Sequence, residues 1–266
     1  MLLALDGRHL HYELIGPANG RTVLLAHALA ADSGMWAEQM PAILAAGRRV
    51  LRMDMRGHGG SDPVSGDYTL QGLAGDIVCL LDALGIPQID YVGLSIGGMI
   101  GEALAIHHPA RVSSLMLCET PPASLKNAKE IWGPRVAVVR EAGSLEPIAD
   151  ATMERWLTPE FRARHGARWR QIRDTVAATS VAGYCGCVAA LSDFDYTHLL
   201  PGLRVPALVL YGEEDRATSH EENQRLAALI PGGRFVAFAG ARHLPNIEDP
   251  ARFNAILTEW LRLPTA

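Results

Sequence analysis

The segment Gly93-Leu94-Ser95-Ile96-Gly97 places a serine between two glycines, in the pattern G-x-S-x-G. The apolar segment IDYVGL before it predicts a buried strand, and IGGMIGEALAIHH after it predicts a helix. A sharp strand-to-helix turn exposes a serine hydroxyl and needs small residues beside it. The pattern alone is weak, but the strand and helix around it make it specific. We therefore predict that Ser95 is a nucleophile.

A serine hydroxyl needs a base, and the base needs an acid that orients it. His243 is the predicted base, because GARHLPNIEDP should form a loop between the last strand and the closing helix. Asp215 follows the predicted strand VPALVLYG, so the chain order is serine, acid, histidine, as is typical of this turn. Glu119, which ends the predicted strand RVSSLMLCE, stays an alternative acid.

Acyl transfer also needs an oxyanion hole made of two backbone N–H groups. One should belong to Ile96, directly after the nucleophile, and the other to the loop that follows the strand TVLLA. In that loop we favour Leu29, with Ala28 as the second candidate. The His27 side chain is expected to hold the loop by hydrogen bonds.

The elements that must position these residues alternate between strands and helices. TVLLAH and IDYVGLS predict buried strands, and LHYELIG predicts a half-buried edge strand. Further strands are predicted for RVLRMDM, RVSSLMLCE, VPALVLYG and GRFVAFAG. The helical segments between them predict an α/β fold with a mostly parallel sheet and helices on both faces. Residues 121–200 lack a buried strand, so we expect a helical cap there, inserted into a core formed by residues 1–120 and 201–266.

The composition argues against several classes of partner. The net charge is −5 and no run of five basic residues occurs, which disfavours nucleic acid. No apolar run approaches the roughly 18 residues of a membrane span, and the apolar N-terminus is too short for a signal peptide. We expect a cytoplasmic enzyme with a small-molecule substrate. The oligomeric state stays open.

The four cysteines, Cys79, Cys118, Cys185 and Cys187, lack the spacing of a small disulfide-stapled scaffold. We expect them to be free and mostly buried, with Cys79 in the apolar stretch DIVCLLDALG. The C-x-C pair at 185–187 has no second Cys or His cluster, so we predict no metal site.

The chain resembles the α/β-hydrolase superfamily, and within it the 3-oxoadipate enol-lactonases. The resemblance spans nearly the full length, through DMRGHGGSD, YVGLSIGGMIGEALA, ERWLTPEFR, GYCGCVAALSDFD, VPALVLYGEED and ARHLPNIEDP. It implies the α/β-hydrolase fold, with Ser95, Asp215 and His243 at the triad positions, no cofactor and no metal. It also implies cleavage of a small carboxylate-bearing lactone. The loop His-Ala-Leu-Ala departs from the Asn-Ser-Leu-Gly of those lactonases.

The substrate pocket should lie beneath the cap, and we expect Trp132, Arg135 and Trp156 to line it. Three alternatives to a lactonase stay open. The chain could be a general carboxylesterase, an acyl transferase or perhydrolase that uses the same triad, or a hydrolase-fold receptor that binds a small ligand. The complete triad favours an enzyme over the receptor.

Overall fold

The computed structural model describes residues 1–262 and contains an eight-stranded sheet in the order β1-β2-β4-β3-β5-β6-β7-β8. β1 and β2 run antiparallel to their neighbours, and the strands from β4 to β8 are parallel, as predicted. The strands are β1 (Leu2–Leu5), β2 (Arg8–Ile15), β3 (Thr22–Ala26), β4 (Arg49–Met53), β5 (Ile89–Leu94), β6 (Val112–Cys118), β7 (Ala207–Gly212) and β8 (Arg234–Phe238).

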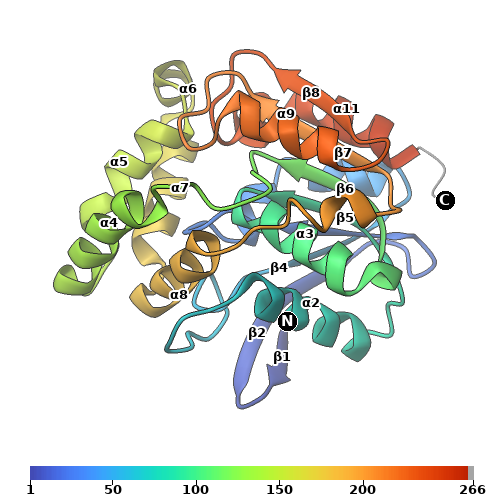
Figure 1. Ribbon diagram of the computed structural model, residues 1–266, viewed down its shortest axis with the longest axis horizontal. Helices are drawn as coiled ribbons and strands as arrows, with labels where there is room; N and C mark the ends of the chain where they lie inside the picture. Colours follow the sequence, from blue (N-terminus) through green and yellow to red (C-terminus); the bar gives the residue numbers. More distant parts are fainter. Residues whose placement is uncertain (263–266) are drawn as a thin grey trace.

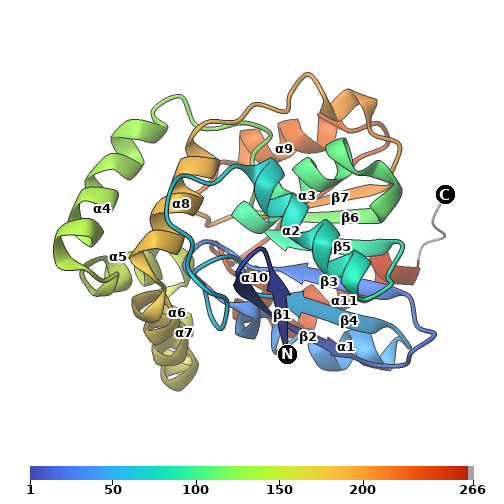
Figure 2. The same cartoon turned by 90° about the horizontal axis from the view of Figure 1, so that it is seen from below.

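Helices cover both faces of this sheet (Figure 1). Figure 2 shows α2, α3 and α9 on one face and α1 and α11 on the other. Between these layers, β3, β5 and β7 are mostly apolar and buried at every position, which is the pattern of strands covered on both faces. The core helices are α1 (Met40–Ala45), α2 (Leu70–Ala83), α3 (Ile96–His107), α9 (His220–Leu229), α10 (Pro245–Glu248) and α11 (Pro250–Arg262).

The segment between β6 and β7 is helical, and its helices gather at one end of the sheet (Figures 1 and 2). These cap helices are α4 (Ala128–Ala142), α5 (Glu146–Trp156), α6 (Pro159–Arg164), α7 (Gly166–Ala178) and α8 (Val181–Ser192). We keep 121–200 as the proposed extent of the cap. Within residues 1–262 no single helix is long and apolar enough to cross a membrane, and only α7 and α8 together, bent by 89°, reach that length and composition.

Two expectations about local structure were wrong. LHYELIG is not at the edge, because β1 pairs with β2 and takes the edge position instead. The two-residue turn Asp6-Gly7 joins them, with φ of 48° and 78°, and an Asp-Gly pair between apolar runs is a hairpin signal. The cysteines are free as expected, but Cys79 is exposed, because it lies on the outer side of α2.

Candidate active site

The turn between β5 and α3 holds Ser95 in a strained conformation. Its φ is 58° and its ψ −123°, which few residues other than glycine adopt. The Ser95 N–H donates to the carbonyl of Cys118, 2.8 Å away on β6. A Cβ atom on Gly93 would lie 2.3 Å from the Gly97 oxygen, and one on Gly97 would lie 2.4 Å from the Ala26 oxygen. The close approach of these backbones explains why the turn needs glycine on both sides of the serine.

His243 lies in the loop between β8 and α10 and contacts the carboxylate of Asp215, with 3.0 Å between Nδ1 and Oδ2. The side chain of Asp215 is fully buried and also accepts hydrogen bonds from the Ala217 N–H and from the N–H and hydroxyl of Thr218. Burial alone would raise the pKa of Asp215, but His243 and these donors outweigh it and lower the pKa to about 2. An ionised carboxylate can only accept, so Nδ1 carries the ring proton and Nε2 is left as a base.

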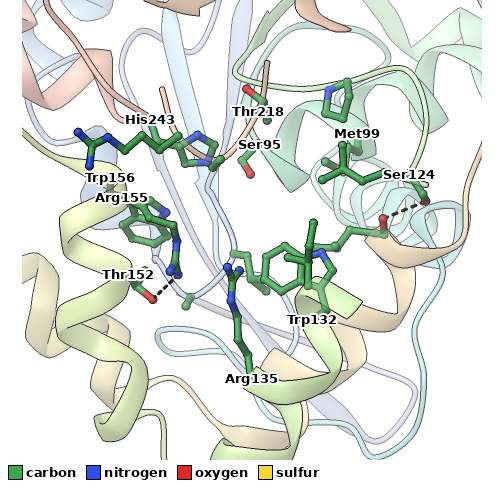
Figure 3. Close-up of a pocket in the computed structure, with 18 of the residues that line it drawn as sticks. Ser95, Met99, Ser124, Trp132, Arg135, Thr152, Arg155, Trp156, Thr218 and His243 are labelled. Atoms are coloured by element: carbon green, nitrogen blue, oxygen red, sulfur yellow. Dashed lines mark hydrogen bonds between the residues drawn. The ribbon is translucent and has the colours of Figure 1, made fainter. Parts of the chain in front are cut away.

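Ser95 and His243 line one cavity of about 230 Å³ beneath the cap (Figure 3). The three residues expected in the pocket, Trp132, Arg135 and Trp156, line it as well. The Trp156 ring stacks on the His243 ring at a centroid distance of 6.3 Å. The structure thus brings together residues from two core loops and two cap helices that lie far apart in the sequence.

The candidate oxyanion donors Ile96, Leu29 and Ala28 differ in whether their N–H groups already donate a hydrogen bond. Ile96 is the first residue of α3, so its N–H has no acceptor within the helix. The Ala28 N–H donates to the sulfur of Met35 at 3.3 Å, whereas the Leu29 N–H has no acceptor within residues 1–262. Leu29 also lines the cavity, so it is the better placed of the two loop candidates.

Two buried histidines hold the loop that carries Leu29. Nε2 of His27 accepts the Met55 N–H at 2.9 Å, and Nε2 of His58 accepts the Ala30 N–H at 3.1 Å. Burial lowers the pKa of both rings, to about 3 for His58, so both stay neutral and can accept. His27 therefore makes the loop-holding hydrogen bonds expected of it, and His58, in the segment Arg56-Gly57-His58-Gly59, is a second such residue.

The cavity also contains cations that we did not single out from the sequence. Arg155 on α5 lines it near Arg135 on α4, and the Arg155 guanidinium donates only a weak hydrogen bond to Thr152, at 3.3 Å. Neither arginine has a carboxylate within 4.0 Å among residues 1–262, and the guanidinium of Arg135 lies 4.7 Å from the centroid of the Trp132 ring. Burial and then the Arg135 charge lower the pKa of Arg155. A third arginine, Arg216, lies exposed at the cavity.

One acid faces these cations across the cavity. Glu222 lines it from α9, but its carboxylate pairs with Arg225 at 3.4 Å. The wall of the cavity therefore carries an excess of positive charge. Arg155 stands next to the predicted pocket residue Trp156 in the segment ERWLTPEFR, which could have marked it as a pocket candidate. The sequence does not show, however, which face of α5 points into the cavity.

The His243 loop is bound to the end of α5. The buried guanidinium of Arg242 donates to the carbonyls of Glu154 at 2.6 Å and Leu157 at 3.0 Å, which α5 leaves without helical partners. The Glu248 carboxylate accepts the N–H of Arg242 at 2.5 Å and the N–H of Thr158 at 2.6 Å. The candidate base and the cap helix that carries Arg155 are thus held in one arrangement.

Comparison with known proteins assigns the chain to a family. The model of the alpha/beta hydrolase fold matches residues 21–142 and 146–250. The 3-oxoadipate enol-lactonase 2 of Acinetobacter baylyi is 33% identical over 92% of this chain and 90% of its own length. The enol-lactonase structure from Burkholderia xenovorans LB400 is 35% identical, covers 99% of this chain and 100% of its own, and superposes with a TM-score of 0.93.

An esterase from Thermogutta terrifontis, solved with malate bound, is 32% identical and covers 98% of this chain and 96% of its own, with a TM-score of 0.89. These relatives match between 92% and 99% of the chain, and the sheet order agrees with the predicted fold. The chain belongs to the α/β-hydrolase fold family.

Proposed function

We propose that the chain is a serine hydrolase that cleaves small esters or lactones bearing a carboxylate, with 3-oxoadipate enol-lactone as the candidate substrate. The observation that carries this proposal is the placement of Ser95 and His243 in the same cavity as Arg135 and Arg155, two cap cations without an acidic partner in the described chain. A cavity of about 230 Å³ suits a small molecule, because pockets for drug-sized ligands are larger.

The proposed reaction is acyl transfer to Ser95. His243 Nε2 takes the hydroxyl proton while the serine oxygen attacks the carbonyl carbon, and the Ile96 and Leu29 N–H groups stabilise the oxyanion. The bond from carbon to the ring oxygen then breaks, and His243 returns the proton to that oxygen. In a lactone the released oxygen stays attached to the acyl-enzyme. Water activated by His243 then hydrolyses the ester to Ser95.

Asp215 keeps the imidazole in the tautomer that this sequence of steps needs. It accepts the Nδ1–H of His243, and its low pKa keeps it ionised throughout the neutral range, so it stabilises the imidazolium that forms twice per turnover. Glu119 makes no hydrogen bond to His243, which supports Asp215 as the orienting acid.

The arginines support an anionic substrate over an uncharged one. Figure 3 shows Arg135 and Arg155 extending from two cap helices toward the space that Ser95 and His243 line from the opposite side. Arg135 and Arg155 are partly buried. A partly desolvated cation without a partner is unfavourable, and a bound carboxylate offsets that. The similarity to two enol-lactonases, and to an esterase solved with malate bound, supports a small carboxylate-bearing substrate as the candidate.

Initial rates test the proposal. We would measure kcat/KM on the enol-lactone of 3-oxoadipate, p-nitrophenyl acetate and p-nitrophenyl butyrate, with Ser95→Ala as the control. We expect a strong preference for the lactone and no turnover by Ser95→Ala. Good turnover of the two neutral esters without the lactone would replace the lactonase with a general carboxylesterase, and full turnover by Ser95→Ala would refute the serine mechanism.

A further inference from the structure

A second carboxyl group lies behind the proposed triad. Glu119 follows β6 directly, with a φ of 51°, and its side chain is completely buried. Its Oε1 accepts the N–H of Gly212 at 2.5 Å. Its Oε2 is buried and has no hydrogen-bond partner within the described chain. The proposed reaction leaves this side chain without a role.

The groups around Glu119 are mostly acidic. A carboxylate oxygen of Glu119, one of Asp215 and a ring nitrogen of His243 lie within 4.8 Å of one another. Asp215 on the β7–α9 loop and Glu248 on α10 disfavour a negative charge on Glu119, as burial does. The other titratable groups beside Glu119 are the Cys118 thiol and the Tyr211 hydroxyl. No lysine or arginine stands among the strongest influences on the pKa of Glu119, so a second negative charge here would lack a close counter-charge.

Two carboxyl groups that meet in a dry interior share a proton, and the group with more hydrogen-bond donors stays ionised. Asp215 accepts from His243, Thr218 and Ala217, whereas Glu119 accepts only from Gly212. The ionised member is therefore Asp215. Burial first, and then the nearby Asp215 carboxylate, raise the pKa of Glu119 well above its usual range.

We propose that Glu119 is a protonated positioning residue whose O–H donates to the Asp215 carboxylate. Glu119 would then be a neutral fourth group behind Ser95, His243 and Asp215. The role in turnover rests on the proposed function, whereas the protonation itself does not. Glu119 keeps its proton through the reaction. Its hydrogen bond withdraws charge from Asp215, which sets how strongly Asp215 favours the imidazolium form of His243.

The acidic limb of the pH–rate profile reports this effect, because kcat/KM falls as His243 becomes protonated in the free enzyme. Glu119→Gln keeps a neutral donor and an acceptor, so we expect its limb to stay within about 0.3 pH units of the wild type. If Glu119 were ionised, removal of its charge at about 5 Å in an effective dielectric of about 20 would lower the limb by about two pH units. A shift of that size would overturn the proposal.

Glu119→Met removes the donor, and we expect its limb to rise by about half a pH unit. An unmoved limb in a folded Glu119→Met protein would refute the positioning role. Glu102 on α3 offers a matched control, because it is equally buried, its carboxyl oxygens are without partners in the described chain, and it does not line the cavity. Glu102→Gln and Glu102→Met should leave the limb unchanged.

Infrared difference spectra separate protonation from catalysis. The spectrum of wild type minus Glu119→Gln at pH 7.5 should contain the carbonyl stretch of a protonated carboxylic acid, and a carboxylate band in its place would overturn the proposal. This readout stands even if no ester or lactone is turned over. In that case the pH dependence of Ser95 sulfonylation by phenylmethanesulfonyl fluoride, followed by intact mass, gives the limb for each variant.

Discussion

Replacement of Arg155 by methionine should lower activity and raise stability in the same protein. Methionine keeps the apolar stem of the side chain and removes the guanidinium. The charge makes one weak hydrogen bond, to Thr152, and faces the like charge of Arg135. In the free protein the Arg155 charge therefore lowers the stability of the fold, and only a bound anion would make it favourable. This opposition of activity and stability is typical of residues kept for function.

The magnitudes follow from the surroundings of Arg155. A hydrogen bond between a charged group and a carboxylate contributes about 1.5–3 kcal/mol, so kcat/KM on a carboxylate-bearing substrate should fall by roughly 10- to 150-fold. On p-nitrophenyl acetate, which has no carboxylate, the change should stay within about threefold. Relief of the burial and of the repulsion from Arg135 should stabilise the fold by about 1 kcal/mol, which raises Tm by about 2–4 °C in a chain of this size.

The assay compares both substrates and the thermal midpoint for the wild type, Arg155→Met and Arg170→Met. Arg170 lies exposed on α7 and does not line the cavity, so it reports the general effect of losing one cap charge. The reasoning is refuted if Arg155→Met loses the two activities equally, or if it lowers Tm. Either result would mean that Arg155 holds the cap together and does not bind an anion.

Three further predictions follow. Asp215→Asn should lower kcat about 10³- to 10⁴-fold with little change in KM, measured by steady-state kinetics, because the imidazole loses the acceptor that fixes its tautomer. The pKa of His58 in the folded state is about 3, below its unfolded value, so its contribution to stability is complete above about pH 6.5 and is lost as the pH falls toward 3. Between pH 7 and pH 5 the free energy of unfolding in urea should therefore fall by about 2 kcal/mol more in the wild type than in His58→Asn. Gly97→Ala should cost several kcal/mol in urea unfolding or prevent folding, because its Cβ would lie 2.4 Å from the backbone oxygen of Ala26; a cost below about 1 kcal/mol would show that the turn can relax.

Much of the fold could be predicted because the signals are local. Fully buried strands such as Thr22–Ala26 are apolar at every position apart from the first, and the helix Leu70–Ala83 begins at Thr69, whose hydroxyl accepts the Gly72 N–H. The edge of the sheet was harder, since alternation in LHYELIG shows one polar face and does not say which strand lies beside it. The Asp6-Gly7 turn carried that information.

The candidate site divides in the same way. Ser95, Asp215 and His243 each follow a strand that ends at the same edge of a parallel sheet, so their chain order already predicted that they would meet. Arg155 could not be assigned in this way, because an arginine on a helix is usually solvated and its direction depends on how α5 packs. Glu119 was open as an acid until the structure gave its hydrogen-bond partner, which is the Gly212 N–H.

The binding of Arg242 and Glu248 to the end of α5 limits how a ligand can enter and leave. An outward swing of α5 would either break those hydrogen bonds or displace the neighbouring His243, so we expect that α5 cannot open without disturbing the proposed base. For the same reason, a cap transplanted from a relative would need to be moved together with the residues that stand at positions 242 and 248 in that relative, because these residues bind the cap to the histidine loop.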